Sequence, residues 1–210
     1  MAIFVELAGV VLHGGTAALD EKILLSFRIV TDVGDPIGPK WVEEMMRDIT
    51  ALGGVGMLVF MTFIVLVYLL MEKYNKAALL LFVAIASGMA VSFTLKYGIT
   101  RPRPDLVPHG SYVYTSSFPS GHAMMSALVY FTIAGLLSHI KLRKRVKSYF
   151  FFVATLLTIS IGISRIYLGV HWPTDVLAGW LLGVGWAILT LFVLRYLKYR
   201  GWIGPQSEDK

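Results

Sequence analysis

The sequence has no cysteine and few charged residues. Of its 210 residues, 15% are charged, against ~25% in ordinary soluble domains, and 56% are hydrophobic. The absence of cysteine excludes disulfides, thiolate nucleophiles and cysteine-ligated metal sites. The sequence also lacks a Gly-x-x-x-x-Gly-Lys loop, which excludes nucleotide hydrolysis by that motif. With a mean hydropathy of +0.69, the composition predicts a membrane protein.

Five apolar stretches each approach the ~20 residues that a helix needs to cross the hydrocarbon of a bilayer. They are Ala51–Met71, Ala77–Leu95, Gly121–Ile140, Ser148–Ser164 and Val176–Leu194. Glycine, serine and threonine recur in the last three, a composition that lets helix backbones approach closely. We therefore expect an all-α, polytopic membrane bundle of five transmembrane helices, with the last three at its core.

Lysine and arginine in the short loops predict the orientation, because they are retained on the cytoplasmic side. Of the 19 such residues, two follow the first stretch, five the third and four the fifth, eleven in all. That side is expected to be cytoplasmic, including a tail over residues 201–210, and residues 1–50 are expected on the opposite side. Because the basic residues sit in these loops, the net charge of +6 does not indicate nucleic acid as a partner.

Two short amphipathic helices are expected in the first fifty residues, over Thr16–Val30 and Pro39–Thr50, separated by a turn over Asp32–Pro39. The second carries apolar residues at i, i+4 and i+8, which are Trp41, Met45 and Ile49. Such helices lie on a membrane surface, and Trp41 would anchor there. Neither helix shows a catalytic constellation.

The stretch Met1–His13 is too short to cross a membrane and lacks the basic start of a signal peptide. We expect that a transmembrane helix preceded it. The alternative is an N-terminal tail that is translocated without one.

Three segments place polar residues at span ends on the outer side. Lys96–Pro104 holds three cations, Phe118–His122 begins the third span, and Ser164–Asp175 joins the fourth span to the fifth. Taken alone, the second segment fits a structural helix cap, since proline and serine favour helix starts. The third alone fits a metal ligand, His171, with Asp175 as its partner, or a polar contact at the membrane interface.

Together, the three segments gather cations, two histidines and two helix N-termini at one membrane surface. Positive charge and free N–H groups indicate an anion site. A histidine oriented by a carboxylate can attack while another protonates a leaving oxygen, so group transfer is expected. A phosphoryl group, with its charge on three oxygens, fits these donors best.

The motifs resemble those of the type 2 phosphatidic acid phosphatase family, membrane lipid phosphatases that share their site with vanadate-dependent haloperoxidases. The family signature is lysine, six residues, arginine-proline; proline-serine-glycine-histidine; and serine-arginine, five residues, histidine, three residues, aspartate. Its fixed positions are met by Lys96, Arg103, Pro104, Pro119, Ser120, Gly121, His122, Ser164, Arg165, His171 and Asp175. The resemblance implies a six-helix fold and a phosphatase domain over residues 51–200.

The resemblance also implies the roles of the site residues. His171 would be the nucleophile that forms a phosphohistidine, Asp175 would orient it, and His122 would protonate the leaving oxygen. The phosphoryl oxygens would be bound by Lys96, Arg103, Ser120, Gly121 and Arg165. No metal or other cofactor is implied, and the substrate would be undecaprenyl pyrophosphate, phosphatidylglycerophosphate or phosphatidate in a bacterial cytoplasmic membrane.

Other polar residues near the motifs are expected to be peripheral. Arg101 lies outside the signature and is expected to contact solvent or headgroups, while Asp105 and His109 belong to the outer loop. Three aromatics are expected at the membrane interface, Tyr112, Tyr114 and Trp172. Two rival functions stay open, a haloperoxidase binding vanadate in the same pocket and a non-enzymatic anion channel or transporter. The sequence does not predict the oligomeric state.

Overall fold

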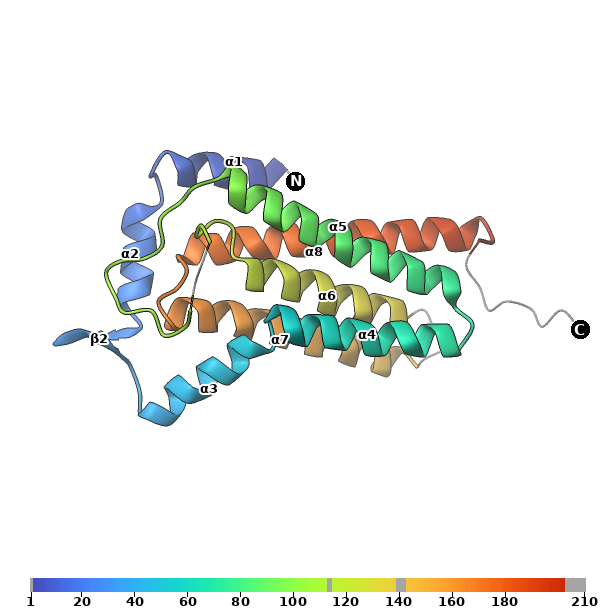
Figure 1. The fold of residues 1–210 in the computed structure, drawn as a ribbon, viewed down its shortest axis with the longest axis horizontal. Helices are drawn as coiled ribbons and strands as arrows, with labels where there is room; N and C mark the ends of the chain where they lie inside the picture. The colour runs from blue at the N-terminus through green and yellow to red at the C-terminus, as the bar shows by residue number, and fades with distance from the viewer. Residues whose placement is uncertain (1, 113–114, 139–142, 203–210) are drawn as a thin grey trace, which may run out of the picture.

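Eight helices and one short hairpin make up the part of the chain that the computed structural model describes, residues 2–112, 115–138 and 143–202. The helices lie mostly along one axis, and the C-terminal end of the last helix is far from the loops that join the others at the opposite end (Figure 1). The elements are α1 Ala2–Leu12, α2 Ala17–Leu25, β1 Arg28–Ile29, β2 Asp32–Pro36, α3 Lys40–Ala51, α4 Val55–Met71, α5 Asn75–Gly98, α6 Gly121–Ser138, α7 Lys144–Tyr167 and α8 Pro173–Tyr199.

Four helices, α5 to α8, are each long and apolar enough to cross a membrane. They contain the last four predicted stretches, except that residues 139–140 of the third lie outside the described part. The expectation of an all-α membrane bundle is confirmed. Counting each bent helix pair as one span raises the number of candidate spans to as many as 6.

The first predicted stretch is divided between two helices. Ala51 ends α3 rather than beginning a span, and α4 begins after a break, at an angle of 48° to α3. Gly54, at the break, is in an extended conformation, which stops the helix (φ −70°, ψ 149°). The α4 helix has 17 residues, so it is about 25 Å long at ~1.5 Å per residue.

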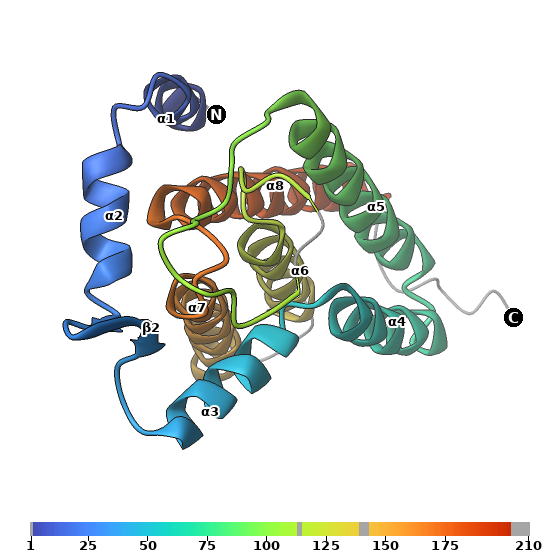
Figure 2. The same ribbon diagram turned by 60° about the vertical axis from the view of Figure 1, so that its left-hand side comes forward.

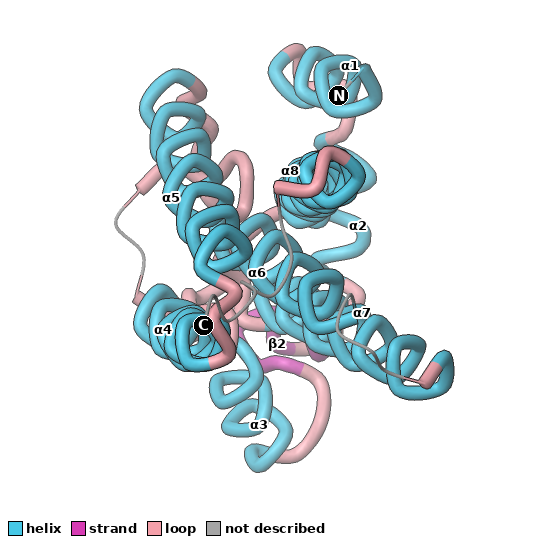
Figure 3. The backbone as a smooth tube through the Cα atoms, turned by 90° about the vertical axis from the view of Figure 1, so that its right-hand side faces the viewer, coloured by secondary structure: helices cyan, strands magenta, loops and turns pink. Residues whose placement is uncertain are grey.

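The α6 helix lies at the centre of the bundle, surrounded by α4, α5, α7 and α8 (Figures 2 and 3). Its span is 61% buried, against 22–39% for the other three. It packs most extensively against α8, then α7. Gly179 and Gly183 of α8 permit this approach, because a Cβ at Gly183 would stand 2.2 Å from the backbone oxygen of Met124. Small residues therefore bring α6 and α8 together as expected, whereas α7, which was also expected in the core, is the least buried of the four spans.

The N-terminal segment packs against the bundle. The α1 and α2 helices meet at 89°. Phe4, Ala8 and Val11 of α1 are buried in an apolar cluster with residues of α6 and α8. The predicted helix over residues 16–30 is shorter, because residues 28–36 form the β1–β2 hairpin, whose second strand replaces part of the expected turn.

The α3 helix packs on the protein through a different face from the one that carries Trp41 and Met45. Trp41 and Met45 are 63% and 39% exposed. Val42 and Met46 instead pack against a cluster at the end of α7, made up of Tyr167, Leu168 and Val170. The apolar pattern therefore predicted the helix correctly, and the expected place of Trp41 at a membrane surface stays a prediction.

Candidate active site

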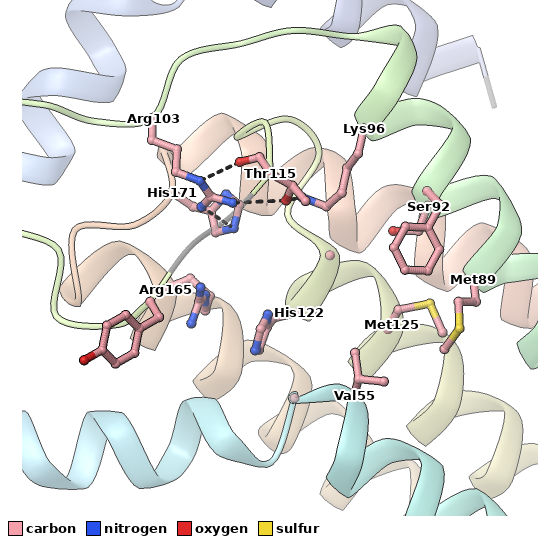
Figure 4. A pocket seen from close by; sticks show the side chains of 14 residues that line it. Val55, Met89, Ser92, Lys96, Arg103, Thr115, His122, Met125, Arg165 and His171 are labelled. Atoms are coloured by element: carbon pink, nitrogen blue, oxygen red, sulfur yellow. Dashed lines mark hydrogen bonds between the residues drawn. The ribbon is translucent and has the colours of Figure 1, made fainter.

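The ends of α5, α6 and α7 and the loop before α8 enclose a cavity of about 290 Å³. The side chains that line it come from elements far apart in the sequence and point toward one another (Figure 4). Six of the predicted site residues are among them: Lys96, Arg103, Gly121, His122, Arg165 and His171. The three motifs are therefore brought to one place, at the end of the bundle away from the C-terminal end of α8.

His171 lies in the short loop between α7 and α8 and is 2% exposed. Its Nε2 is 3.2 Å from Nη1 of Arg103. A guanidinium can only donate, so Nε2 accepts and is the unprotonated nitrogen of a neutral ring. The ring proton is then on Nδ1, which lies 3.5 Å from Oδ2 of Asp175, somewhat longer than an ordinary hydrogen bond.

Burial controls the ionisation of the groups in this loop region. Burial lowers the pKa of the His171 imidazole well below its ordinary value, although Asp175 partly opposes the shift. Burial also lowers the pKa of Arg103, and Asp175 again opposes it. An arginine stays charged at neutral pH despite such a shift. The cavity therefore holds a neutral imidazole next to a permanent cation.

Asp175 stands in the first turn of α8 and is fully buried. Its Oδ2 accepts hydrogen bonds from the backbone N–H of Trp172, at 2.9 Å, and from Oγ of Ser117, at 2.5 Å. The first of these closes a capping box at the start of α8. Asp175 is thus held by backbone and side-chain donors with one oxygen facing His171.

Two of the cations are positioned by the loop that precedes α6. Nζ of Lys96 donates to Oγ1 of Thr115, at 3.2 Å, and to the carbonyl of Ser116, at 3.1 Å. Nε of Arg103 donates to the carbonyl of Thr115, at 2.9 Å, and Nη1 donates to the carbonyl of Val170, at 2.6 Å. The motif alone did not indicate these carbonyl partners, which aim both cations into the cavity.

Arg165, near the end of α7, is 2% exposed and reaches the cavity from the other side. Its Nη1 donates to Oγ1 of Thr50 on α3, at 3.0 Å. Among the described residues, its Nε has no hydrogen-bond partner. A buried donor without a partner is costly, so an anion in the cavity would satisfy it.

The start of α6 supplies the remaining motif residues. Gly121 and His122 line the cavity, and the His122 ring makes no hydrogen bond to any residue in the described ranges. Ser120 is fully buried and does not line the cavity. Its Oγ instead lies 3.5 Å from the backbone nitrogen of Ala123, at the helix N-cap position.

The opposite wall of the cavity is apolar. It is formed by residues at the start of α4 and on the facing sides of α5 and α6: Val55, Met89, Phe93 and Met125. Phe93, near the end of α5, is 49% exposed, so this wall adjoins the lipid-facing surface of the bundle. One cavity thus combines three cations and two histidines with an apolar wall.

Among the residues expected to be peripheral, Arg101 differs from expectation. Arg101 does not face solvent or headgroups, since its side chain is 12% exposed and bridges Asp20 and Asp175. Trp172 lies over Arg101, with 5.7 Å between the guanidinium carbon and the ring centroid. His109 lies with Asp105 in the loop between α5 and α6, as expected, and contacts the carbonyl of Pro104. Tyr112 is 89% exposed, and Tyr114 lies outside the described residues.

No group of three or more histidine, cysteine, aspartate or glutamate residues could hold a metal ion in the described ranges. The predicted independence from metals stays a prediction. The three cations can instead bind an anion, and the neutral His171 can act as a nucleophile or a base. Fold and site define a polytopic membrane protein with a cationic, histidine-containing cavity at one end of its helix bundle.

Comparison with known proteins identifies the family to which the chain belongs. A family model described as the PAP2 superfamily matches residues 77–199, so the chain belongs to that superfamily. Phosphatidylglycerophosphatase B of Bacillus subtilis (strain 168) is 38% identical over 149 residues, which are 69% of this chain and 71% of that protein. Undecaprenyl-diphosphatase of Sulfolobus acidocaldarius is 28% identical over 120 residues, 55% of this chain and 54% of that protein.

A solved structure agrees over nearly the whole chain. The crystal structure of the first transmembrane PAP2 type phosphatidylglycerolphosphate phosphatase from Bacillus subtilis matches with a TM-score of 0.81 and 30% identity. The match covers 95% of this chain and 94% of that one. These matches confirm the expected family and the expected membrane bundle. Because the relatives are phosphatases, they also confirm the expectation of a lipid phosphatase.

Proposed function

We propose that the protein hydrolyses the terminal phosphate of a membrane lipid phosphate or pyrophosphate through a phosphohistidine intermediate. The observation that carries the proposal is the position of Nε2 of His171, 3.2 Å from Nη1 of Arg103 in a cavity with an apolar wall. An unprotonated nitrogen beside a cation can attack the phosphorus of a phosphate that the cation holds. The apolar wall accommodates the first carbons of a lipid tail.

In the first step, Arg103 moves its hydrogen bond from Nε2 of His171 to the phosphoryl oxygens, Nε2 attacks the phosphorus, and the bond to the leaving oxygen breaks. The proton on Nδ1 stays with the ring, and Asp175 stabilises the positive charge that develops there. His122 donates a proton to the leaving oxygen. The negative charge of the bound phosphoryl group favours the protonated form of His122.

In the second step, water attacks the phosphohistidine. His122, now neutral, accepts the proton of that water, and the N–P bond breaks to release inorganic phosphate. His171 returns to its neutral form and His122 to its protonated form. The cycle consumes one water molecule and leaves the enzyme unchanged.

The phosphoryl oxygens are bound by Lys96, Arg103 and Arg165 together with the amide of Gly121. Nε of Arg165, which has no hydrogen-bond partner within the described part of the chain, supports its part in this binding. Ser120 contributes by capping α6, so that the amides of the first turn face the phosphate. These donors stabilise the charge of the transition state, a role that metal ions fill in other phosphatases.

Phosphatidylglycerophosphate is the substrate to test first. The relative with the higher identity and the solved structure both carry that substrate in their names, and the Sulfolobus relative is named for undecaprenyl diphosphate. Phosphatidate is a third candidate. All three present a terminal phosphate on an anchored tail, which suits a cavity that combines cations with an apolar wall.

The site is proposed to face the extracytoplasmic side of a bacterial cytoplasmic membrane. Residues 1–50 are then extracytoplasmic or interfacial, and residues 201–210 are a cytoplasmic tail. The basic residues at the far end of the bundle support this orientation, since Lys73 and Lys76 follow α4 while Arg195 and Lys198 lie near the end of α8.

A substrate panel tests the proposed function. Purified protein in detergent would be given phosphatidylglycerophosphate, undecaprenyl pyrophosphate, phosphatidate and water-soluble glycerol phosphate, and released phosphate would be measured. We expect kcat/KM for at least one of the lipids to exceed that for glycerol phosphate by a hundredfold or more, an estimate of roughly 3 kcal/mol for the tail contact. Equal values for lipid and soluble substrates would contradict the lipid specificity.

A further inference from the structure

Arg101 joins two carboxylates from distant parts of the chain. Its Nη2 donates to Oδ2 of Asp20 on α2, at 2.7 Å, and its Nη1 donates to Oδ1 of Asp175 on α8, at 2.5 Å. Both carboxylate side chains are fully buried, and the Arg101 side chain is 12% exposed. The three charges form an Asp20–Arg101–Asp175 bridge that leads to His171.

The bridge fixes how Asp175 is turned. Arg101 occupies Oδ1, so Oδ2 is left for the donors of Ser117 and Trp172 and for Nδ1 of His171. A buried carboxylate needs such partners, because burying an unpaired charge is costly. Without Arg101, Oδ1 would lose its ionic partner, and the carboxylate that faces His171 would be held through Oδ2 alone.

The backbone of Arg101 acts on the same pair. Its carbonyl accepts the N–H of Ser117, at 2.9 Å. Oγ of Ser117 lies 2.5 Å from Oδ2 of Asp175 and 3.5 Å from Nδ1 of His171. Arg101 therefore positions both groups that face the Nδ1 side of the nucleophile.

Asp20 in turn fixes Arg101 to the start of α8. Its Oδ1 accepts a hydrogen bond from the backbone N–H of Thr174, at 2.9 Å. Its Oδ2 accepts hydrogen bonds from two hydroxyl groups, those of Thr174, at 2.7 Å, and Thr16, at 2.9 Å. With the hydrogen bond from Arg101, every oxygen of this buried carboxylate is satisfied. The N-terminal segment is thereby tied to the catalytic end of α8.

We propose that Arg101, held by Asp20, is a positioning residue for the Asp175–His171 pair. This inference rests on the proposed function, because it assigns a role in the attack by His171. Arg101 does not line the cavity that holds the cations, so it acts through Asp175 rather than on the phosphate. Its loss should lower kcat and leave KM for the lipid nearly unchanged.

The test compares Arg101→Ala, Arg101→Lys, Asp20→Asn and the Asp20→Asn/Arg101→Ala double variant with the wild type, using phosphatidylglycerophosphate or the best lipid substrate of the panel. Hydrogen-bond partners of metal-binding histidines typically contribute about 10- to 100-fold, and by analogy we expect Arg101→Ala to lower kcat by a factor of that order. Arg101→Lys should recover part of the loss, since a lysine keeps the charge but cannot bridge both carboxylates in the same way.

The double variant tests whether Asp20 acts through Arg101. Asp20→Asn alone should lower kcat, and it should have no further effect when Arg101 is already alanine. Glu21→Gln, on the exposed side of α2, and Arg145→Ala, exposed at the start of α7, are matched controls that should keep wild-type kcat and KM. Thermal unfolding of every variant separates lost positioning from lost folding.

Several results would overturn the inference. These are wild-type kcat in Arg101→Ala, a rise in KM with unchanged kcat, additive effects in the double variant, and loss of kcat only in proportion to the folded fraction. If Arg101→Ala fails to fold, Arg101→Lys and Asp20→Asn decide by the same criterion, a fall in kcat with KM unchanged. Failure of all three to fold would assign the bridge to stability alone. A wild type without activity on any lipid would instead refute the proposed function.

Discussion

Nη1 of Arg103 lies 3.2 Å from Nε2 of His171, so a cation that can only donate faces the nitrogen proposed to attack phosphorus. This contact sets the tautomer of the ring without any substrate. It also places positive charge where the phosphoryl oxygens would lie. The arrangement explains how a buried, neutral histidine can meet a dianionic phosphate.

His122→Ala should slow hydrolysis most for substrates with poor leaving groups. The variant lacks the proton donor, and such donors contribute about 10²- to 10⁴-fold. We expect a large loss of kcat for an alkyl lipid phosphate and a smaller one for a nitrophenyl phosphate, whose leaving group needs no proton. His13→Ala, an exposed histidine on the N-terminal segment, is the matched control. Equal losses for both substrates would contradict the role of His122 as an acid.

The ring of His171 should remain neutral in mildly acidic solution. Burial lowers its pKa, so protonation requires a pH below the ordinary histidine value of about 6.5. Nitrogen-15 NMR of histidine-labelled protein in detergent would report this directly, with His171→Ala identifying the signal. We expect a neutral ring, protonated on Nδ1, from pH 8 down to about pH 5. A titration midpoint near the ordinary value would show that the ring is not desolvated.

Thr50→Val should lower kcat/KM through its effect on Arg165. The Thr50 hydroxyl accepts from Nη1 of Arg165, and valine would leave a second donor of this buried guanidinium without a partner. Such a loss costs about 1–3 kcal/mol, so we expect kcat/KM to fall about tenfold. Thr62→Val is the control, because its buried hydroxyl only bonds to the carbonyl of Leu58 in its own helix. Equal effects of the two substitutions would exclude a specific role for Thr50.

Gly183→Ala should destabilise the bundle, and Gly185→Ala should not. A Cβ at Gly183 would collide with the Met124 backbone, while a Cβ at Gly185 meets nothing within 4 Å. Overpacking of this kind costs about 1–3 kcal/mol. Thermal unfolding in detergent should show a lower midpoint for Gly183→Ala only. A wild-type midpoint for that variant would mean that α6 and α8 can move apart to fit the added methyl group without loss of stability.

The sequence predicted the parts of the fold that depend on local pattern. Long apolar stretches became helices α5 to α8, because hydrocarbon requires every backbone group to be paired within the helix. Their motif residues meet because each motif lies at a span end on the same side. The break between α3 and α4 was missed, although Gly53 and Gly54 mark it within an otherwise apolar stretch.

The residues that sequence reasoning missed all depend on long-range contacts. Arg101 bonds to Asp20, 81 residues away, and Thr50 bonds to Arg165, 115 residues away, so no local spacing links them. A weak signal existed for Asp20, which shares a helix face with Leu24, four positions later. A carboxylate on a core-facing position is a candidate for a buried partner, but the sequence could not name Arg101 as that partner.

Phosphate release from phosphatidylglycerophosphate and undecaprenyl pyrophosphate, in detergent with excess EDTA, tests the proposed chemistry most directly. Wild type, His171→Ala and the control His13→Ala would be compared at equal amounts of folded protein. We predict release by the wild type and His13→Ala and none by His171→Ala. Release by His171→Ala at the wild-type rate, or loss of all wild-type activity in EDTA, would contradict a metal-independent attack by His171.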